Sequence, residues 1–420
     1  KELGVKIVLV DKGLTGWSKL KDTVKVFFGA KSQDHWAKGL VDEFIDSDNT
    51  KPLEAQTRVK EKLLRSARKR GEIDGITTFW EDDVPLTADL AQSLGLPYHT
   101  SEASRLVRSK GLTRRAMEEA GLPTPRFQTI KIAAHSNTIA SSRQQLERFT
   151  EHVGFPAVLK PAFGAAAQGV KRVNNKAEAL AAFDEMIEVF SQDVIFEQGW
   201  DMVLEQYLDG PEYDVDIIMQ GGKAKFVSTT DNWPTKEPVF LATGSSLPSV
   251  LPKDKTAEIE DLAIKTAKAL GLTDGVIHIE GKYTKEGARI IEANGRMGGV
   301  YVRDWVKAVW GVDLVEESFY AAAGIPVGAF KSPKPLTYLE GEFLIPQESG
   351  TLDKFHLDDN AREQEGFHEL RQMKKVGDRI AVPPHGYDRV GMLVAKGQNR
   401  TQAQKNLDAL RAELILDIKK

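Results

Sequence analysis

The sequence predicts an α/β protein that begins with a parallel unit and ends with a smaller α+β unit. Val5 to Val10 is a short, continuous apolar run, which is typical of a buried parallel strand, and Ile73 to Trp80 is interpreted as the next buried strand. A helical pattern separates them at Thr57 to Arg70 and closes at a glycine. Strands that alternate with helices favour a parallel sheet. Near the other end, strand-like runs at Thr337 to Ile345 and Arg389 to Ala395 indicate a separate α+β unit.

The elements between these ends follow from periodicity and from glycine and proline punctuation. A pair of helices is predicted over Ser101 to Ala120, and single helices are predicted at Leu86 to Leu94, Lys176 to Val189, Thr256 to Leu270, Asp304 to Ala323 and Thr401 to Ile415. Strands are predicted at Ala157 to Lys160, Gly169 to Val173, Val203 to Tyr207, Tyr213 to Met219, Gly275 to Tyr283 and Ala288 to Asn294. Loops are predicted at His135 to Arg143 and, with four prolines, at Asn232 to Pro252. A loop as long as the second is usually functional.

Composition narrows the class of protein. A chain of 420 residues exceeds what one hydrophobic core usually supports, so we expect two or three domains. The net charge of -4 gives no electrostatic case for nucleic acid, and the basic runs at 65–70 and 105–115 are better explained as solvated helix faces. The chain has no cysteine, which excludes disulfides, thiolate catalysis and Cys-ligated metals. No apolar run approaches the length of a membrane span.

The strongest functional signal is the predicted hairpin from Gly275 to Gly299. Because side chains alternate along a strand, Glu280 on the first strand and Glu292 on the second can lie side by side. Adjacent carboxylates repel each other, and a cation is the usual resolution. With the amide oxygen of Asn294 they form a set of hard oxygen ligands suited to Mg²⁺ with nucleotide phosphates. Arg296, just beyond the strand, could neutralise developing phosphate charge.

Two weaker signals precede the hairpin. Lys160 ends a strand and is followed by the small-residue loop Gly164 to Gly169, whose backbone could approach phosphate closely. It is not a Walker A loop, and alone a tight turn would explain it equally well. Further on, a strand carrying Glu205 exits into a turn before Glu212, so the two could face an adenine edge and a ribose. Taken singly, an ordinary strand and turn is the simpler interpretation.

The order and spacing of these signals resemble the ATP-grasp superfamily of carboxylate–amine ligases. The resemblance covers about residues 1–400 and rests on Lys110, Lys160, the small-residue loop, Glu205, Glu212, Glu280, Glu292, Asn294 and Arg296. It implies a Rossmann-like α/β domain at 1–105, an ATP-grasp domain at 106–330 and a small α+β domain at 331–420. Two subdomains, divided near 205–210, would clasp ATP.

The same resemblance assigns a role to each matching residue. ATP binding would involve Lys110, Lys160, Gly164, Ala165, Ala166, Gln168, Gly169, Glu205, Gln206, Tyr207, Leu208 and Glu212. Glu280, Glu292 and Asn294 would carry Mg²⁺, as two ions, with Mn²⁺ as an alternative metal. Arg296 would stabilise the acyl phosphate and the transferring phosphoryl group. His278 could bind substrate or deprotonate the amine, although a structural strand histidine is equally plausible.

Three further segments resemble carnosine synthase and the bacterial L-amino acid ligases. They are Gly164 to Lys171, Asp231 to Thr235 and Asn294 to Trp305. The likeness implies a ligase that joins two amino acids through an acyl phosphate. The substrate-binding residues would be Asp231, Trp233, Gly298, Gly299, Tyr301 and Arg303, with a packing role as the alternative for Trp233.

The expectation is therefore a cytoplasmic enzyme with no nucleic-acid or membrane partner, and a homodimer is one alternative because dimers are common among similar ligases. Three rival hypotheses remain. The first is another ATP-grasp enzyme, such as a biotin carboxylase-like or purine-pathway ligase. The second is a non-enzymatic nucleotide-binding regulatory module, which would have lost metal ligands that this sequence retains. The third is an NAD-binding protein, disfavoured because no G-x-G-x-x-G follows Val5 to Val10.

Overall fold

The computed structural model describes nine segments of the chain, and the account below concerns these alone. They are residues 8–11, 43–46, 57–65, 73–132, 138–164, 167–190, 200–237, 239–382 and 386–420. The expected site residues Ala165 and Ala166 lie outside them, as does the first half of the predicted strand at Val5 to Val10.

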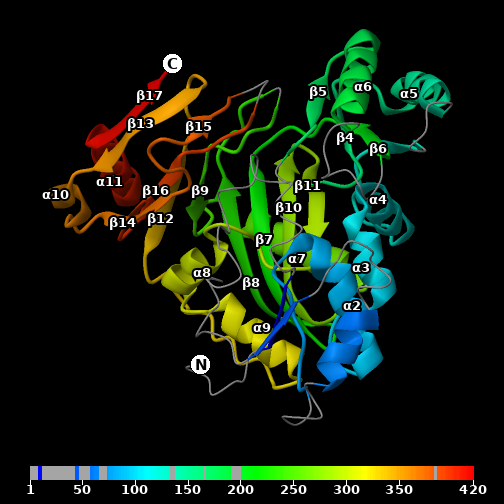
Figure 1. The fold of residues 1–420 in the computed structure, drawn as a ribbon, viewed down its shortest axis with the longest axis horizontal. Helices are drawn as coiled ribbons and strands as arrows, with labels where there is room; N and C mark the ends of the chain where they lie inside the picture. The colour runs from blue at the N-terminus through cyan, green and yellow to red at the C-terminus, as the bar shows by residue number, and fades with distance from the viewer. Residues whose placement is uncertain are drawn as a thin grey trace.

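An eight-stranded antiparallel sheet forms the centre of the molecule (Figure 1). Its strand order is β11-β10-β7-β8-β9-β12-β16-β14. The strands are β7 (Glu212–Gln220), β8 (Lys223–Asn232), β9 (Gly244–Leu247), β10 (Gly275–Thr284), β11 (Gly287–Asn294), β12 (Tyr338–Leu344), β14 (Phe367–Gln372) and β16 (Gly391–Gly397). The last three belong to the predicted C-terminal unit, so this unit extends the central sheet.

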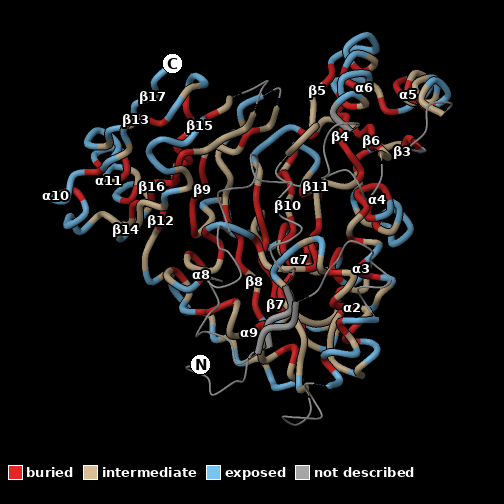
Figure 2. The backbone as a smooth tube through the Cα atoms, in the orientation of Figure 1, coloured by how far each residue is buried: buried red, intermediate tan, exposed pale blue. Residues whose placement is uncertain are grey.

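Helices cover both faces of the strands that carry the site. Alternate residues of β7, from Tyr213 to Met219, pack against α7 (Lys253–Ala269). On the opposite face Ile218 joins the core of α8 (Val302–Trp310) and α9 (Leu314–Ala322). The middle of the sheet is accordingly buried on both sides, as the continuous red stretches of Figure 2 show. Polar side chains in this region therefore lie in an enclosed environment, where unpaired charge is costly.

A smaller lobe stands beside the turn end of the β10–β11 hairpin (Figure 1). Its four-stranded sheet has the order β3-β6-β4-β5. The strands are β3 (Phe127–Ile130), β4 (Ala157–Pro161), β5 (Lys171–Val173) and β6 (Met202–Gln206). Two helices, α5 (Ile139–Val153) and α6 (Lys176–Phe190), share an apolar core with this sheet.

The two ends of the chain supply the remaining elements. At the N-terminal end these are the parallel pair β1 (Val8–Asp11) and β2 (Glu43–Asp46), the 3₁₀ turn η2 (Glu81–Asp83) and the helices α2 (Val84–Leu94), α3 (Ser101–Arg108) and α4 (Lys110–Glu119). At the C-terminal end, β13 (Gly350–Leu357), β15 (Arg379–Ile380) and β17 (Leu414–Lys419) form a third sheet, with α10 (Asp359–Arg362) and α11 (Arg400–Ala412). The parallel β1–β2 pair agrees with the predicted α/β start.

Four local predictions were wrong. Ile73 to Trp80 is no strand, since it pairs with no strand among the described residues and leaves Trp80 51% exposed. The predicted loop at His135 to Arg143 becomes helix α5 from Ile139. The loop at Asn232 to Pro252 contains β9, whose buried side chains include two serines and so give no apolar run. The helix at Asp304 to Ala323 is divided at Gly311, which adopts a left-handed conformation.

Gly210 joins the two lobes in a conformation that excludes other residues. Its φ is +87° and its Cα faces the backbone carbonyl of Tyr283, so an added Cβ would collide with that oxygen. We expect Gly210→Ala to lower the free energy of unfolding by about 2–4 kcal/mol, measured by urea denaturation. The control is Gly221→Ala, which also has positive φ but meets nothing within 4 Å, and should cost only about 1 kcal/mol. Equal losses would contradict the steric explanation.

Candidate active site

The hairpin places its two acidic side chains opposite each other, as predicted, and a β-bulge between Glu280 and Gly281 sets this register. Glu280 pairs directly with Glu292, and His278 pairs with Asn294. On the other side of β10, the register places His278, Glu280 and Lys282 opposite three acidic residues of β7, namely Asp216, Asp214 and Glu212. One face of three neighbouring strands thus carries alternating acidic side chains, a pattern that suits cation binding.

Asp214 and Asp216 were not among the predicted site residues. Their signal was present as the period-two series Glu212-x-Asp214-x-Asp216, but it lay inside a strand that was predicted only from its apolar residues. Burial raises the pKa of Asp214 well above its usual range, against the charge of His278. Burial, with Glu280 nearby, also raises the pKa of Glu212 to about 7. These carboxyl groups therefore hold protons more readily than ordinary surface acids.

His278 lies among these carboxylates. Its Nδ1 is 3.0 Å from Asp216 Oδ1, and its Nε2 is 3.6 Å from Glu280 and 3.9 Å from Asp214. Although burial opposes its charge, Asp216 and Asp214 raise its pKa well above the usual value. An imidazolium donates from both nitrogens and has no free lone pair, so it cannot accept a proton. The arrangement favours a role for His278 in holding Glu280 and balancing charge over one as a general base.

Lys110 connects three parts of the predicted nucleotide site. It begins α4, and its Nζ lies 3.1 Å from Glu292 Oε1 and 3.3 Å from the carbonyl oxygen of Gly164. Gly164 opens the small-residue loop, in which Gln168 and Gly169 complete a turn packed beside Pro161. The lysine therefore joins the loop predicted for phosphates to a carboxylate predicted for the metal.

Lys160 and Glu205 form an ion pair that is almost completely buried. Arg114 completes it, with its Nε 3.1 Å from Glu205 Oε2 and a hydrogen bond to the Ile291 carbonyl. Burial lowers the pKa of Lys160, while Arg114 and Lys160 hold the pKa of Glu205 down against its own burial. Arg114 is fully buried, so the prediction of a solvated helix face at 105–115 is wrong at this position.

The turn after β6 carries the other predicted nucleotide contacts. The Gln206 amide donates to the carbonyl of the residue before β3, and the Tyr207 amide donates to the carbonyl of the residue before β4. Leu208 is buried. The Tyr207 hydroxyl donates to Glu237 at 2.7 Å, and Arg172 lies 4.4 Å from its ring centroid. Glu212 begins β7, with Lys282 Nζ 3.9 Å from its carboxylate. These side chains lie where the small lobe meets the central sheet.

Arg296 is held by an acidic residue from the N-terminal part of the chain. Its Nε lies 2.7 Å from Glu81 Oε2, and its Nη1 donates to the Met297 carbonyl at 2.8 Å. Glu81 also pairs with Arg108 at 3.0 Å, so one carboxylate connects α3 to the turn that carries Arg296. Glu81 was not predicted as a site residue, although its place just past an apolar run was visible in the sequence.

The predicted substrate residues divide into two groups. Gly298 and Tyr301 contact the central sheet. The Gly298 amide donates to Asp216 of β7 at 3.4 Å, and the Tyr301 hydroxyl lies 2.6 Å from Ser245 Oγ of β9. Gly299 follows in the same turn, where an added Cβ would meet nothing within 4 Å. Arg303 instead pairs with Asp313, the cap of α9, at 2.6 Å. It is thus occupied in joining two helices.

Asp231 and Trp233 lie at the junction with the C-terminal unit. Asp231 accepts hydrogen bonds from Ser249 and the Val250 amide, and Arg400 of α11 lies 3.5 Å away. The Trp233 indole donates to Ser246 at 2.8 Å, and its ring packs on the core of the C-terminal unit. These contacts agree with the packing alternative for Trp233.

Family models match most of the chain in three pieces. Residues 1–98 match the ATP-grasp N-terminal domain, residues 153–304 the ATP-grasp domain, and residues 342–419 the L-amino acid ligase C-terminal domain 2. The chain belongs to the ATP-grasp superfamily. The predicted α/β fold of this superfamily is confirmed, and the family implies ATP binding and use of a divalent metal ion.

Individual proteins agree with this assignment. Carnosine synthase 1 of Gallus gallus is 34% identical over 76% of this chain, and that of Homo sapiens 33% over 73%. The match spans only 34% and 38% of those two proteins, respectively. Alanine–anticapsin ligase of Bacillus subtilis is 27% identical, over 78% of this chain and 72% of its own.

The fold also matches that of a solved L-amino acid ligase from Bacillus licheniformis. The TM-score is 0.80 at 21% identity, with 100% of this chain and 94% of that chain covered. No helix in the described part of this ATP-grasp chain is long and apolar enough to cross a membrane.

The donor set fits a metal bound together with nucleotide phosphates. Among the described residues, no three His, Asp or Glu side chains are grouped as a metal site on their own. Glu280, Glu292 and Asn294 offer two carboxylates and one amide. So few protein oxygens suit Mg²⁺, which usually keeps phosphate and water ligands as well.

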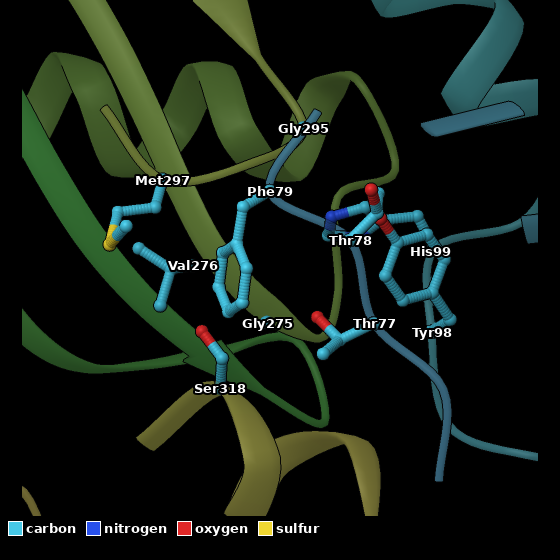
Figure 3. Close-up of a pocket in the computed structure, with 10 residues that line it drawn as sticks. All are labelled: Thr77, Thr78, Phe79, Tyr98, His99, Gly275, Val276, Gly295, Met297 and Ser318. Atoms are coloured by element: carbon cyan, nitrogen blue, oxygen red, sulfur yellow. The ribbon is translucent and has the colours of Figure 1, made fainter. Parts of the chain in front are cut away.

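A small pocket lies beside Gly295 and Met297, the two chain neighbours of Arg296 (Figure 3). Its lining comes from the N-terminal part, the hairpin ends and α9, and includes Thr77, Tyr98, His99, Gly295, Met297 and Ser318. His99 is 2% exposed, and an added Cβ on Gly295 would lie 3.4 Å from its ring. The His99 ring therefore packs against Gly295, the residue that precedes Arg296.

His99 makes stability depend on pH. Burial lowers its pKa from 6.5 to about 4, so the folded protein keeps it neutral where the unfolded chain binds a proton. Its contribution to the free energy of unfolding is therefore complete above pH 6.5 and declines as the pH falls towards 4. Between pH 6.5 and 4, unfolding should take up as much as about one proton fewer in His99→Gln than in the wild type. The free energy of unfolding should therefore change less steeply with pH in the variant. His152→Gln, at an exposed position, is the control, and an unchanged slope in His99→Gln would contradict the assignment.

Proposed function

We propose that this chain is an ATP-dependent ligase that joins two amino acids through an acyl phosphate. The observation that carries the proposal is the facing pair Glu280 and Glu292, with Asn294 beside it and both Lys110 and Arg296 nearby. The named relatives include ligases for amino acids, which supports the substrate class. Glu280, Glu292 and Asn294 would hold Mg²⁺, as one or two ions, with Mn²⁺ as an alternative.

The first step would be attack of a substrate carboxylate oxygen on the γ-phosphorus of ATP. The bond to the β–γ bridging oxygen breaks, and ADP leaves with that electron pair. Lys110 and Lys160 would bind the nucleotide phosphates, and the Gly164 to Gly169 loop would offer its backbone amides. A bound divalent ion would supply neutralisation of the phosphate charge. Arg296 would stabilise the charge that develops on the transferring phosphoryl group.

The second step would be attack of an amine on the acyl carbon, with loss of phosphate and of one amine proton. Arg296 and backbone amides near Gly299 would stabilise the oxyanion. No nucleophilic side chain is required for either step. Because His278 faces carboxylates at both ring nitrogens, we do not assign it the proton transfer.

The substrates are tested by phosphate release from ATP and Mg²⁺ across a matrix of amino acid pairs. The matrix includes β-alanine with histidine, so that α- and β-amino acid donors are compared, and products are identified by mass. We expect release that depends on a specific pair and a product with the mass of a dipeptide. Pair-independent release, or ATP binding without release, would instead favour another carboxylate–amine ligase, a biotin carboxylase-like enzyme or a regulatory nucleotide-binding module.

The metal assignment is tested by Glu292→Gln. This variant keeps the shape of the side chain but removes a charged ligand, so we expect kcat to fall by roughly 10²-fold or more. Glu286→Gln is the matched control, because Glu286 lies in the turn of the same hairpin with its side chain 63% exposed. The control should retain wild-type kcat and Mg²⁺ dependence. Near-normal kcat in Glu292→Gln would remove Glu292 from the metal site.

A further inference from the structure

The turn that follows Arg296 contains a residue in an unfavourable backbone conformation. Val300 has a φ of +58°, which is the left-handed region. A β-branched side chain is disfavoured there because its Cβ crowds the following carbonyl. Its side chain is 42% exposed, so burial of that side chain does little to offset the cost. Other contacts must therefore hold the turn in this form.

Contacts on the two sides of Val300 come from the central sheet. On one side the Gly298 amide donates to Asp216, and an added Cβ on Gly298 would lie 2.7 Å from His278 Nδ1. On the other side the Tyr301 hydroxyl contacts Ser245. These contacts fix the neighbours of Val300, but they leave the peptide between Val300 and Tyr301 to be held by something else.

That peptide is held by Arg371 of β14, a strand 71 residues further along the chain. One guanidinium nitrogen donates to the Val300 carbonyl, and Nη2 lies 2.6 Å from Asp304 Oδ2 on α8. Glu369, two residues before Arg371 on the same strand, accepts from its Nε at 2.8 Å. The Glu369 carboxylate thus orients the guanidinium, whose other nitrogens contact the turn and α8. The planar fork of an arginine can make all three contacts together, whereas a lysine has a single nitrogen.

We propose that Arg371 is a positioning residue for the amino acid substrates, which acts by holding Val300 and so the Gly298 to Tyr301 turn in its binding conformation. The proposal rests on the proposed function, in which this turn lies against the substrate carboxylate and the oxyanion. It also gives the C-terminal unit a role in catalysis, because β14 supplies the arginine, whereas the site residues predicted from the sequence, Lys110 to Arg303, all come from earlier in the chain.

The test compares steady-state kinetics of Arg371→Ala, Arg371→Lys and the control Arg411→Ala. Arg411 also belongs to the C-terminal unit and pairs with Glu342, on β12 of the central sheet, but it does not contact the turn. In Arg371→Ala we expect the KM for the amino acid substrates to rise roughly tenfold or more, since the left-handed conformation costs a branched side chain about that factor in population. The KM for ATP should remain within about twofold of that of the control. Lysine should not restore the wild-type values, because it cannot make the forked contacts.

A second substitution separates this role from a general structural one. Glycine adopts positive φ without strain, so Val300→Gly added to Arg371→Ala should recover roughly tenfold in kcat/KM for the amino acids. Recovery would support the proposal. Equal changes in the KM for ATP and for amino acids, or no recovery with glycine, would overturn it.

Crystal structures of the same variants make the test independent of activity. In Arg371→Ala, φ of Val300 should leave the left-handed region, while in Arg411→Ala it should stay there. An unchanged turn in Arg371→Ala would overturn the proposal even if activity were lost. Failure of the proposed function would appear differently, as absence of pair-dependent phosphate release in the wild-type protein.

Discussion

The face shared by β7, β10 and β11 carries more negative charge than the interior of a protein accepts without compensation. Glu212, Asp214 and Asp216 stand opposite a strand that itself contains Glu280, and Glu292 follows on the next strand. Like charges at this spacing destabilise a sheet, and burial makes the repulsion stronger. Positively charged side chains must therefore lie close to this face. Their positions constrain how several elements pack against the sheet.

Two of these positively charged residues tie another part of the chain to the sheet, and His278 lies within the sheet itself. Lys110 brings the start of α4 to Glu292. His278 occupies the space between Asp216 and Glu280 from within β10. Arg296 follows β11 and forms an ion pair with Glu81, which belongs to the N-terminal part of the chain. A bound nucleotide and its metal would contact these same charged side chains. Phosphate would then take the place of a carboxylate beside Lys110, and the metal ion would take the place of Lys110 beside Glu292.

The sequence was informative wherever one short segment carried the whole signal. The hairpin was predicted, because strand alternation and a short turn determine it. The facing of Glu280 and Glu292 was predicted as well, but it depends on a β-bulge between Glu280 and Gly281, since the register at the turn would place Ile291 opposite Glu280. Arg114 could not be predicted as a buried residue, because its partners Glu205 and Ile291 are 91 and 177 residues away. Arg371 likewise gave no local signal, since its role depends on a strand that returns to the central sheet. β9 was missed because buried serines do not produce an apolar pattern.

Arg114 shows why the two lobes adopt one arrangement. From α4 it reaches Glu205 on β6 of the small lobe and the Ile291 carbonyl on β11 of the central sheet. A buried set of charges is weak support for stability, because the cost of removing them from water offsets most of their attraction. It does, however, penalise any other arrangement strongly, since a shift of either lobe would leave a buried charge unpaired. The Lys160–Glu205–Arg114 set therefore fixes the orientation of the lobes, and with it the distance between the loop proposed to bind phosphates and the acidic hairpin.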